Sequence, residues 1–109
     1  MGRIAIVNGV RTPFVKAWDA FDGIPAQQLG ALCLTELLRR TGLDSRLVDE
    51  VVLGCVAQPA EASNVARVAS LLAGLPQKTK AYTVSRNCAS GFESVTSAAE
   101  KILCGVDEI

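Results

Sequence analysis

The sequence AYTVSRNCASG, residues 81–91, joins two patterns of different period. Residues 81–85 alternate in polarity and are rich in side chains that favour β-structure, which predicts a strand. From about residue 88 to 104 the apolar side chains recur at helical spacing, which predicts a helix. Those side chains are Phe92, Val95, Ala99, Ile102 and Leu103. A strand that leads directly into a helix is the basic joint of an α/β fold.

Upstream of this joint, residues 26–41 are predicted to form a helix. Pro25 stands where the first turn begins, and its missing N–H costs nothing there. Arg39 and Arg40 complement the helix dipole in the last turn, and Gly42 ends the helix. The apolar stripe consists of Leu29, Leu32, Cys33, Leu37 and Leu38.

A second strand and a second helix are predicted between these two segments. The run VVLGCV, residues 51–56, is continuously apolar, as expected for a strand that is covered on both faces. Ser63 or Asn64 can cap the helix that follows, and Gly74 ends it. The apolar set of that helix is Val65, Val68, Ala69 and Leu72.

The two ends of the chain carry further expectations. Residues 3–10 contain a β-branched run, which predicts a first short buried strand. Residues 11–23 hold three large aromatic side chains, so we expect a loop that packs onto the body of the protein; they are Phe14, Trp18 and Phe21. Residues 106–109 resemble the approach to a fourth strand.

The resulting order is an alternation of strands and helices, which predicts the α/β class. Helical crossovers between successive strands imply a mainly parallel or mixed sheet that is covered by helices. The length of 109 residues fits one domain. Because the sequence stops at the start of an apparent strand, we expect residues 1–109 to be a partial domain of a longer protein.

Composition excludes several classes of protein. Half of the residues are hydrophobic, and 11 basic residues balance 11 acidic ones, which gives no electrostatic case for nucleic acid or an anionic membrane. No apolar run approaches the roughly 20 residues that a membrane span needs, and the N-terminus lacks a signal-peptide core. We therefore expect a soluble, cytoplasmic protein. The chain has no histidine, which excludes a histidine base or a histidine-ligated metal within it.

Four cysteines stand at positions 33, 55, 88 and 104, and no two form a CxxC pair. This spacing excludes a zinc ribbon and a thioredoxin motif, and we expect reduced thiols. Cys33 lies on the apolar stripe of a helix, Cys55 lies in a strand, and Cys104 lies in a last helical turn. For these three we expect packing roles.

Cys88 has a different setting, at the junction of a strand and a helix. Ligands of open α/β sheets collect at the carboxyl ends of the strands, where this junction lies. The free N–H groups and the dipole of the helix favour a thiolate and could stabilise an oxyanion. Cys88 is therefore a candidate nucleophile for acyl transfer, and the alternative is a small buried side chain without a chemical role.

The remaining candidates favour structural roles. Arg67, in the sequence NVAR, could bind a phosphate, but an exposed or ion-paired helical arginine is the better expectation. Arg11, in the sequence RTPF, is expected to anchor the loop that follows it. Gly54 and Gly105 belong to no glycine-rich nucleotide motif, so a dinucleotide site has no support.

Taken together, these segments resemble the N-terminal part of a thiolase. The matching pieces occur in the order of that family; they are RTPF at 11–14, VDEV at 48–51, LG at 53–54, NVAR at 64–67 and NCASG at 87–91. The sequences SNVAR and YTVSR resemble the branch that serves fatty-acid β-oxidation, including the thiolase subunit of a multifunctional complex.

The resemblance implies an acyltransferase that uses coenzyme A as co-substrate and no tightly bound cofactor. Cys88 would take the acyl group of a 3-ketoacyl-CoA, release acetyl-CoA and pass the acyl group to a second CoA, and the reverse condensation is equally implied. In the family, histidines and a second cysteine supply the acid and base, and these lie beyond the residues matched here. We therefore expect this chain alone to lack turnover.

The resemblance also implies an architecture. Thiolases have a duplicated, five-layered α/β fold, of which residues 1–109 would form most of the first half. The family dimerises through the strand before the nucleophile, so residues 81–86 would pair with a second copy. The segments that contact CoA lie outside the match, and we assign no CoA contacts. Two alternatives remain open: a non-catalytic binding or dimerisation module, and a condensing enzyme of the ketoacyl-synthase type.

Overall fold

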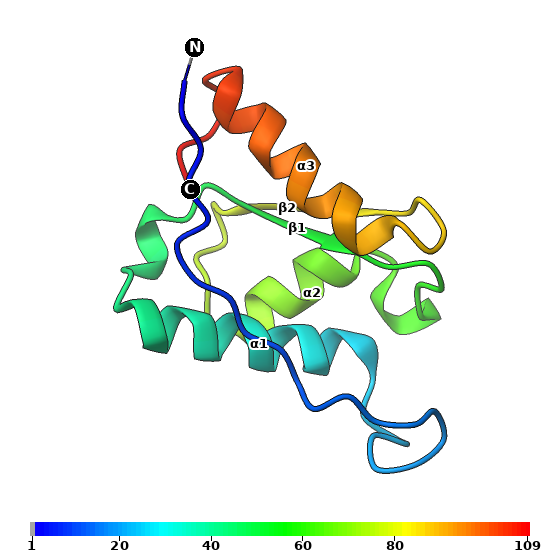
Figure 1. The fold of residues 1–109 in the computed structure, drawn as a ribbon. Coiled ribbons are helices and arrows are strands. Elements are labelled where there is room, and N and C mark those ends of the chain that lie inside the picture. Colours follow the sequence, from blue (N-terminus) through cyan, green and yellow to red (C-terminus); the bar gives the residue numbers. More distant parts are fainter. Residues whose placement is uncertain (1) are drawn as a thin grey trace.

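The computed structural model describes residues 2–109, and it is an α/β arrangement (Figure 1). The elements follow in the order α1 (Ala26–Thr41), β1 (Glu50–Gly54), α2 (Val65–Leu72), β2 (Lys80–Val84) and α3 (Ser90–Leu103). Single turns of 3-10 helix cover Ser45–Leu47 and Ala60–Ala62. The helix over residues 26–41 is confirmed at both ends, and both central strands are confirmed. The first of them ends at Gly54, so Cys55 and Val56 lie outside the strand that was expected to include them.

The two strands pair in parallel, in a register that runs from Glu50 opposite Lys80 to Gly54 opposite Val84. Helix α3 packs on one face of this sheet, and α2 packs on the other with α1 beneath it (Figure 1). Because both strands run in the same direction, their carboxyl ends lie at one edge of the sheet. The segment that carries Cys88 begins at that edge.

The core lies between α1, α2 and the sheet. Its buried centre is Val51, Ala66 and Leu75, and half-buried apolar side chains surround it. Small residues allow the layers to approach closely: a Cβ on Gly30 of α1 would lie 3.2 Å from the Cβ of Ala69 and 3.3 Å from a methyl group of Leu53. This close packing holds α1 against both α2 and β1.

Helix α1 ends as its sequence predicts. Gly42 has a left-handed φ of 65°, and its N–H donates to the carbonyl of Leu38. Glu36 accepts hydrogen bonds from Arg39 and Arg40, and these bonds lower the pKa of its carboxyl to about 2. Both arginines therefore contact a carboxylate one turn earlier on the exposed side of the helix.

Asn64 joins α2 to β2 through its side chain. Its Oδ1 caps the helix by accepting from the Arg67 N–H at 3.2 Å, and it also accepts from the Thr83 hydroxyl at 2.9 Å. Its Nδ2 donates to the carbonyl of Ala81 at 3.0 Å. The Thr83 hydroxyl in turn accepts from the N–H of Ala66. One amide thus ties the start of a helix to two positions of a strand.

We expect Asn64→Ala to lower the free energy of unfolding by about 2 kcal/mol, because it removes a helix cap and leaves strand groups unpaired. Urea unfolding followed by circular dichroism measures this. Ser63→Ala is the matched control, because Ser63 is exposed and makes no side-chain hydrogen bond among those described for residues 2–109. Equal losses in the two variants would contradict the assigned cap.

Two ion pairs lie at the amino ends of the strands, opposite to the edge that precedes Cys88. Lys80 pairs with Asp107, whose side chain is 5% exposed, and Lys101 pairs with the buried carboxylate of Glu50. The Lys101 ammonium also lies 4.5 Å from the centre of the Tyr82 ring. These pairs fasten α3 and the segment after it to the amino ends of both strands, away from Cys88.

Asp49 adds a titratable contact at this end. Its carboxylate accepts from the N–H groups of Glu108 (2.8 Å) and Ile109 (3.2 Å). These two hydrogen bonds lower the pKa of the Asp49 carboxyl from its usual value, and the bond from Glu108 has the larger effect.

Since the folded state holds this carboxyl at a lowered pKa, its contribution to stability is complete above the unfolded pKa of about 3.9 and is lost as the pH falls further. We expect Asp49→Asn to reduce stability at pH 7 and to leave it less sensitive to pH below about pH 4. Urea midpoints measured from pH 7 to pH 2.5 test this. A constant difference between the two proteins over that range would contradict it.

The predicted strand over residues 3–10 is wrong. This segment forms no strand; it runs from beside the end of α3 down to α1, with Ile6 84% exposed and Val7 83% exposed (Figure 1). A strand needs a partner for its backbone groups. On the outer edge of β1, the N–H of Glu50 instead donates to the carbonyl of Ile109 at 3.4 Å.

The expected packing of residues 11–23 is also wrong. Phe14 is fully exposed and Trp18 is 91% exposed, whereas Phe21 is half-buried. Trp18 has a φ of 58° within a series of turns over residues 17–23. Aromatic content indicated burial, but the described residues offer no surface that covers these rings.

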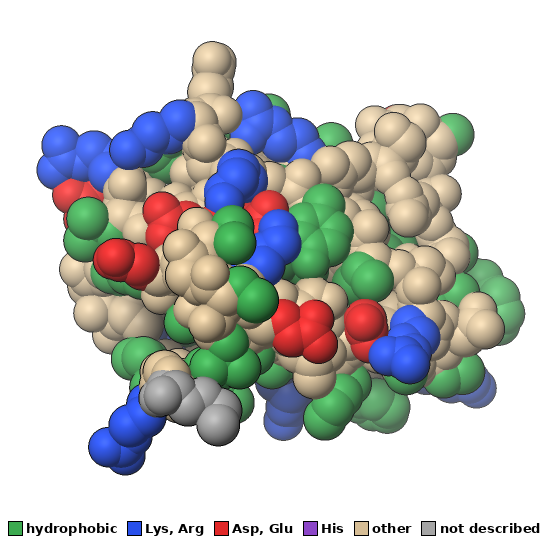
Figure 2. Space-filling view, turned by 90° about the horizontal axis from the view of Figure 1, so that it is seen from above, with side chains coloured by type: hydrophobic (Ala, Val, Ile, Leu, Met, Phe, Trp, Pro, Cys, Tyr) green, Lys and Arg blue, Asp and Glu red, His purple; other side chains and the backbone are tan. Residues whose placement is uncertain are grey.

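Residues 106–109, which resemble the approach to a fourth strand, contain no strand of their own, and the Ile109 carbonyl accepts from the N–H groups of Asp49 and Glu50. The apolar set of α3 is only partly covered, with Phe92 76% exposed. Figure 2 looks onto the molecule from the α3 side and shows hydrophobic side chains lying among acidic and basic ones.

Candidate functional site

Cys88 lies in the turn between β2 and α3, two residues before the helix begins, and its side chain is exposed. The turn is tight: the N–H of Ala89 donates to the carbonyl of Arg86, and the N–H of Ser90 donates to that of Asn87. The helix predicted from residue 88 therefore starts at Ser90, with Ala89 as its N-cap. Cys88 stands beside the helix N-terminus, accessible to a substrate.

The Ser90 hydroxyl adds two side-chain hydrogen bonds to this turn. Its Oγ accepts from the N–H of Arg86 at 2.8 Å and donates to the carbonyl of Asn87 at 2.7 Å. Asn87 has a φ of 48°, a left-handed conformation that asparagine tolerates better than most residues. The backbone immediately before Cys88 is thus held in an unusual shape by a buried side chain.

Gly54 packs directly against the backbone at the end of this turn. It is the last residue of β1, and a Cβ at its position would lie 2.3 Å from the carbonyl oxygen of Ser90 and 2.7 Å from the backbone nitrogen of Gly91. Only a glycine leaves room for the first turn of α3 there. The end of one strand and the turn after its neighbour therefore meet in direct backbone contact.

The charged groups at the turn neutralise each other. Arg86 forms an ion pair with Glu93 in the first turn of α3. The hydrogen bond to Glu93 raises the pKa of the Arg86 guanidinium. Glu93 also lies where a carboxylate is favourable, near the positive end of the helix dipole.

The other three cysteines do not join Cys88. Cys33 and Cys55 are half-buried, in keeping with packing, and the Cys55 thiol contacts the carbonyl of Ala57 at 3.5 Å. Cys104 is exposed, so the packing expected for it is wrong; it follows the last turn of α3, at the far end from Cys88. Within residues 2–109, no group of acidic and sulfur side chains could hold a metal ion.

Arg67 binds backbone carbonyls, whereas its sequence suggested a phosphate contact or an exposed or ion-paired side chain. Its guanidinium donates to the carbonyls of Thr79 (2.9 Å) and Gln77 (3.1 Å). It therefore holds the connection between α2 and β2 through backbone carbonyls, and within residues 2–109 it forms no ion pair with a carboxylate. Gly105 simply ends α3 in a left-handed conformation, with a φ of 71°.

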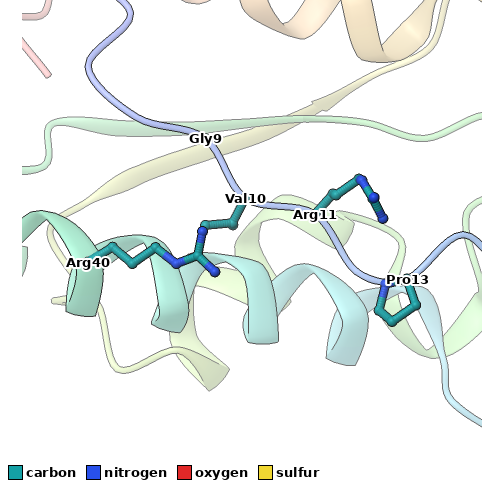
Figure 3. A pocket seen from close by; sticks show the side chains of 5 residues that line it. All are labelled: Gly9, Val10, Arg11, Pro13 and Arg40. Carbon is teal, nitrogen blue, oxygen red and sulfur yellow. The ribbon is translucent and has the colours of Figure 1, made fainter.

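Arg11 lies in an open hollow between the N-terminal segment and α1, of about 670 Å³, lined by Gly9, Val10, Arg11, Pro13 and Arg40. Figure 3 shows Arg40 reaching from α1 toward Val10, whereas the Arg11 side chain points away from α1, so the two guanidinium groups do not converge. Arg11 is exposed, and the hydrogen bond described for its guanidinium is to the carbonyl of Thr12, its neighbour. It anchors nothing beyond that neighbour, contrary to expectation.

The sequence predicts Cys88 as the candidate nucleophile but does not predict the contacts of Ser90 and Gly54 that position it. A glycine as the last residue of an apolar strand is a signal of close backbone approach, and it could have marked Gly54. Nothing in the sequence indicates which helix approaches it.

These observations define the class of protein. An exposed cysteine stands at the carboxyl end of parallel strands, in a turn that opens a helix, within an α/β fold. Residues 4–109 match the family model for the thiolase N-terminal domain. The chain therefore belongs to the thiolase family.

Individual relatives agree with this assignment. The chain is 49% identical to a 3-ketoacyl-CoA thiolase of Aeromonas salmonicida over 98% of its own length and 24% of the relative. It is 50% identical to a 3-ketoacyl-CoA thiolase of Serratia proteamaculans, with 94% and 24% of the two chains covered. The chain thus spans about a quarter of the length of these relatives.

Solved structures confirm the fold. The acetyl-CoA acetyltransferase of Bacillus anthracis superposes with a TM-score of 0.79 at 38% identity, covering 82% of this chain and 23% of the other. The Acat5 thiolase of Ascaris suum, solved in complex with coenzyme A, superposes with a TM-score of 0.86 at 25% identity over 91% and 26%. In residues 2–109, no helix combines the length and apolar character required to cross a bilayer.

Proposed function

We propose that the protein carrying this chain is a 3-ketoacyl-CoA thiolase in which Cys88 carries the acyl group. The observation that supports this most strongly is the identity of 49% to a 3-ketoacyl-CoA thiolase over 98% of the chain, including the turn that exposes Cys88. An acetyl-CoA acetyltransferase, whose name indicates a different substrate, shares the fold. A cysteine at the carboxyl edge of a parallel sheet is well placed to attack a bound ligand.

The proposed reaction has two half-reactions. In the first, the Cys88 sulfur attacks the C3 carbonyl of a 3-ketoacyl-CoA, and the bond between C2 and C3 breaks. The electron pair of that bond stays on C2, which takes up a proton and leaves as acetyl-CoA. In the second, the sulfur of a new CoA attacks the thioester on Cys88, releases a shortened acyl-CoA and returns the cysteine sulfur.

The residues of this chain would supply the nucleophile and its setting. The N-terminus of α3 favours negative charge on the sulfur and on the oxygen of the tetrahedral intermediate. The exposed position of Cys88 leaves its sulfur open to the C3 carbonyl of a 3-ketoacyl-CoA. With no histidine among the 109 residues, we propose that the acid and base come from parts of the protein beyond this chain.

We further propose that residues 1–109 work as the N-terminal part of a larger thiolase, as their match to a quarter of the relatives' length suggests. The exposed rings of Phe14 and Trp18 are surfaces that such a protein would bury. Cytoplasmic β-oxidation, with a multifunctional partner subunit, is the proposed setting. Pairing of residues 81–86 across a two-fold axis is the proposed dimer contact; β2 has an unpaired edge in this structure.

Initial-rate kinetics of the protein as its gene encodes it test the proposed function. Acetyl-CoA formation is measured while the concentrations of a 3-ketoacyl-CoA and of CoA are varied together. An acyl-enzyme intermediate predicts ping-pong kinetics, with parallel lines in a double-reciprocal plot. Intersecting lines, or no formation of acetyl-CoA, would contradict the proposal.

A further inference from the structure

We propose that Ser90 is a positioning residue for Cys88, an inference that rests on the proposed function. Its hydroxyl is the side-chain group that connects both residues preceding the cysteine: it accepts from the N–H of Arg86 and donates to the carbonyl of Asn87. Ser90 itself is 4% exposed, so these hydrogen bonds are shielded from water. The backbone that presents Cys88 is therefore fixed from the first residue of α3.

The geometry explains why this side chain matters for the orientation of the thiol. The turn from Arg86 to Ser90 already has two backbone hydrogen bonds, but neither involves the Arg86 N–H as donor. Without the Ser90 hydroxyl, that N–H has no other partner described within residues 2–109. An unpaired N–H favours opening of the turn toward water.

Opening of the turn would move Cys88 relative to the helix. Asn87 holds a left-handed φ of 48°, which asparagine tolerates and which the hydrogen bond from Ser90 to its carbonyl helps to hold in place. Once the Ser90 contact is lost, Asn87 can relax to an ordinary conformation and carry Cys88 away from the first turn of α3. The helix dipole acts only within about one turn, so its effect on the sulfur would decline.

The other contacts at the turn would persist. Arg86 and Glu93 pair through their side chains, and that pair does not use the Ser90 hydroxyl. Gly54 contacts the Ser90 backbone, which a change of side chain leaves in place. The change Ser90→Ala thus tests the hydroxyl while the charges near Cys88 stay the same.

The experiment measures the rate at which iodoacetamide alkylates Cys88 at pH 7 and compares it with the rate at Cys104, in the protein as its gene encodes it, with the labelled peptides quantified by mass spectrometry. We expect Ser90→Ala to slow the alkylation of Cys88 about tenfold and to leave that of Cys104 unchanged. Ser94→Ala is the matched control, because the Ser94 hydroxyl donates to the Gly91 carbonyl on the same helix and does not contact the turn. That variant should match the unmodified protein.

Ser90→Thr keeps a hydroxyl and is expected to restore the original rate at Cys88. A role in folding alone predicts a lower melting temperature for Ser90→Ala with an unchanged rate at Cys88, and that result would overturn the inference. If Ser90→Ala does not fold, hydrogen exchange of the unmodified protein decides: the Arg86 N–H should exchange at least about 100-fold more slowly than an open amide. Exchange at the open rate would also overturn it.

The rates at the four cysteines distinguish a failure of the proposed nucleophile from a failure of the proposed positioning residue. If Cys88 of the unmodified protein reacts no faster than Cys33, Cys55 and Cys104, the proposed nucleophile itself fails. If Cys88 reacts first but Ser90→Ala leaves its rate of alkylation unchanged, only the positioning role fails.

Discussion

Replacing Cys88 by alanine is expected to lower the rate of acetyl-CoA formation by roughly 10⁴-fold or more, because no other group can take its place as the acyl carrier. Cys88 is exposed, so its removal should change the free energy of unfolding by less than about 0.5 kcal/mol. The loss of rate would then report chemistry rather than unfolding. Steady-state rates and urea unfolding of the same preparation measure the two quantities.

Cys104→Ala is the matched control for this change. Cys104 is exposed in the same way but follows the far end of α3. We expect this variant to retain the full rate. A Cys88→Ala protein that keeps more than a tenth of the original rate, or a Cys104→Ala protein that loses most of it, would contradict the assigned nucleophile.

The largest expected effect on stability comes from Gly54→Ala. The added methyl group would lie 2.3 Å from the Ser90 carbonyl oxygen and 2.7 Å from the Gly91 nitrogen, and both are backbone atoms that cannot rotate away. Helix α3 must then shift from the sheet, at a cost of about 3 kcal/mol. Urea unfolding measures the loss, and alkylation of Cys88 should slow in parallel.

Gly91→Ala provides the comparison for this change. Gly91 lies in the first turn of α3, and a Cβ there has no atom within 4 Å. Alanine is the better helix former, so we expect no loss of stability or a gain of up to about 1 kcal/mol. If Gly54→Ala were as harmless as Gly91→Ala, the close contact between β1 and the turn would not exist in solution.

The sequence predicted best the features that are encoded locally. The helix over residues 26–41 has its stop signal in Gly42, which adopts the left-handed cap that its position required. Asn64 was one of two candidate caps, and it is the one that accepts the N–H of Arg67. The strands over residues 50–54 and 80–84 were recognisable from their β-branched and apolar runs.

Features that depend on distant partners were predicted poorly. The run around Ile6 has the composition of a strand, but pairing depends on which edge is available and not on composition. Trp18 was expected to be buried because it is large and apolar, although burial needs a second surface.

At the candidate site, the position of Cys88 between a strand and a helix could be predicted because its neighbours in sequence form that joint. Its supports could not be found in that way, since Gly54 lies 34 positions earlier in the sequence and the Ser90 hydroxyl acts only once the turn has formed. In both cases the contact is a property of the folded chain.

The most direct test of the account is to trap the acyl group on its carrier. The protein as its gene encodes it is mixed with acetyl-CoA, quenched in acid and digested, and the peptides are mapped by mass spectrometry. We predict a hydroxylamine-sensitive acetyl thioester on the peptide that contains Cys88, and unmodified peptides for Cys33, Cys55 and Cys104. An acetyl group on one of those three cysteines in place of Cys88, or on none of the four, would contradict the central claim.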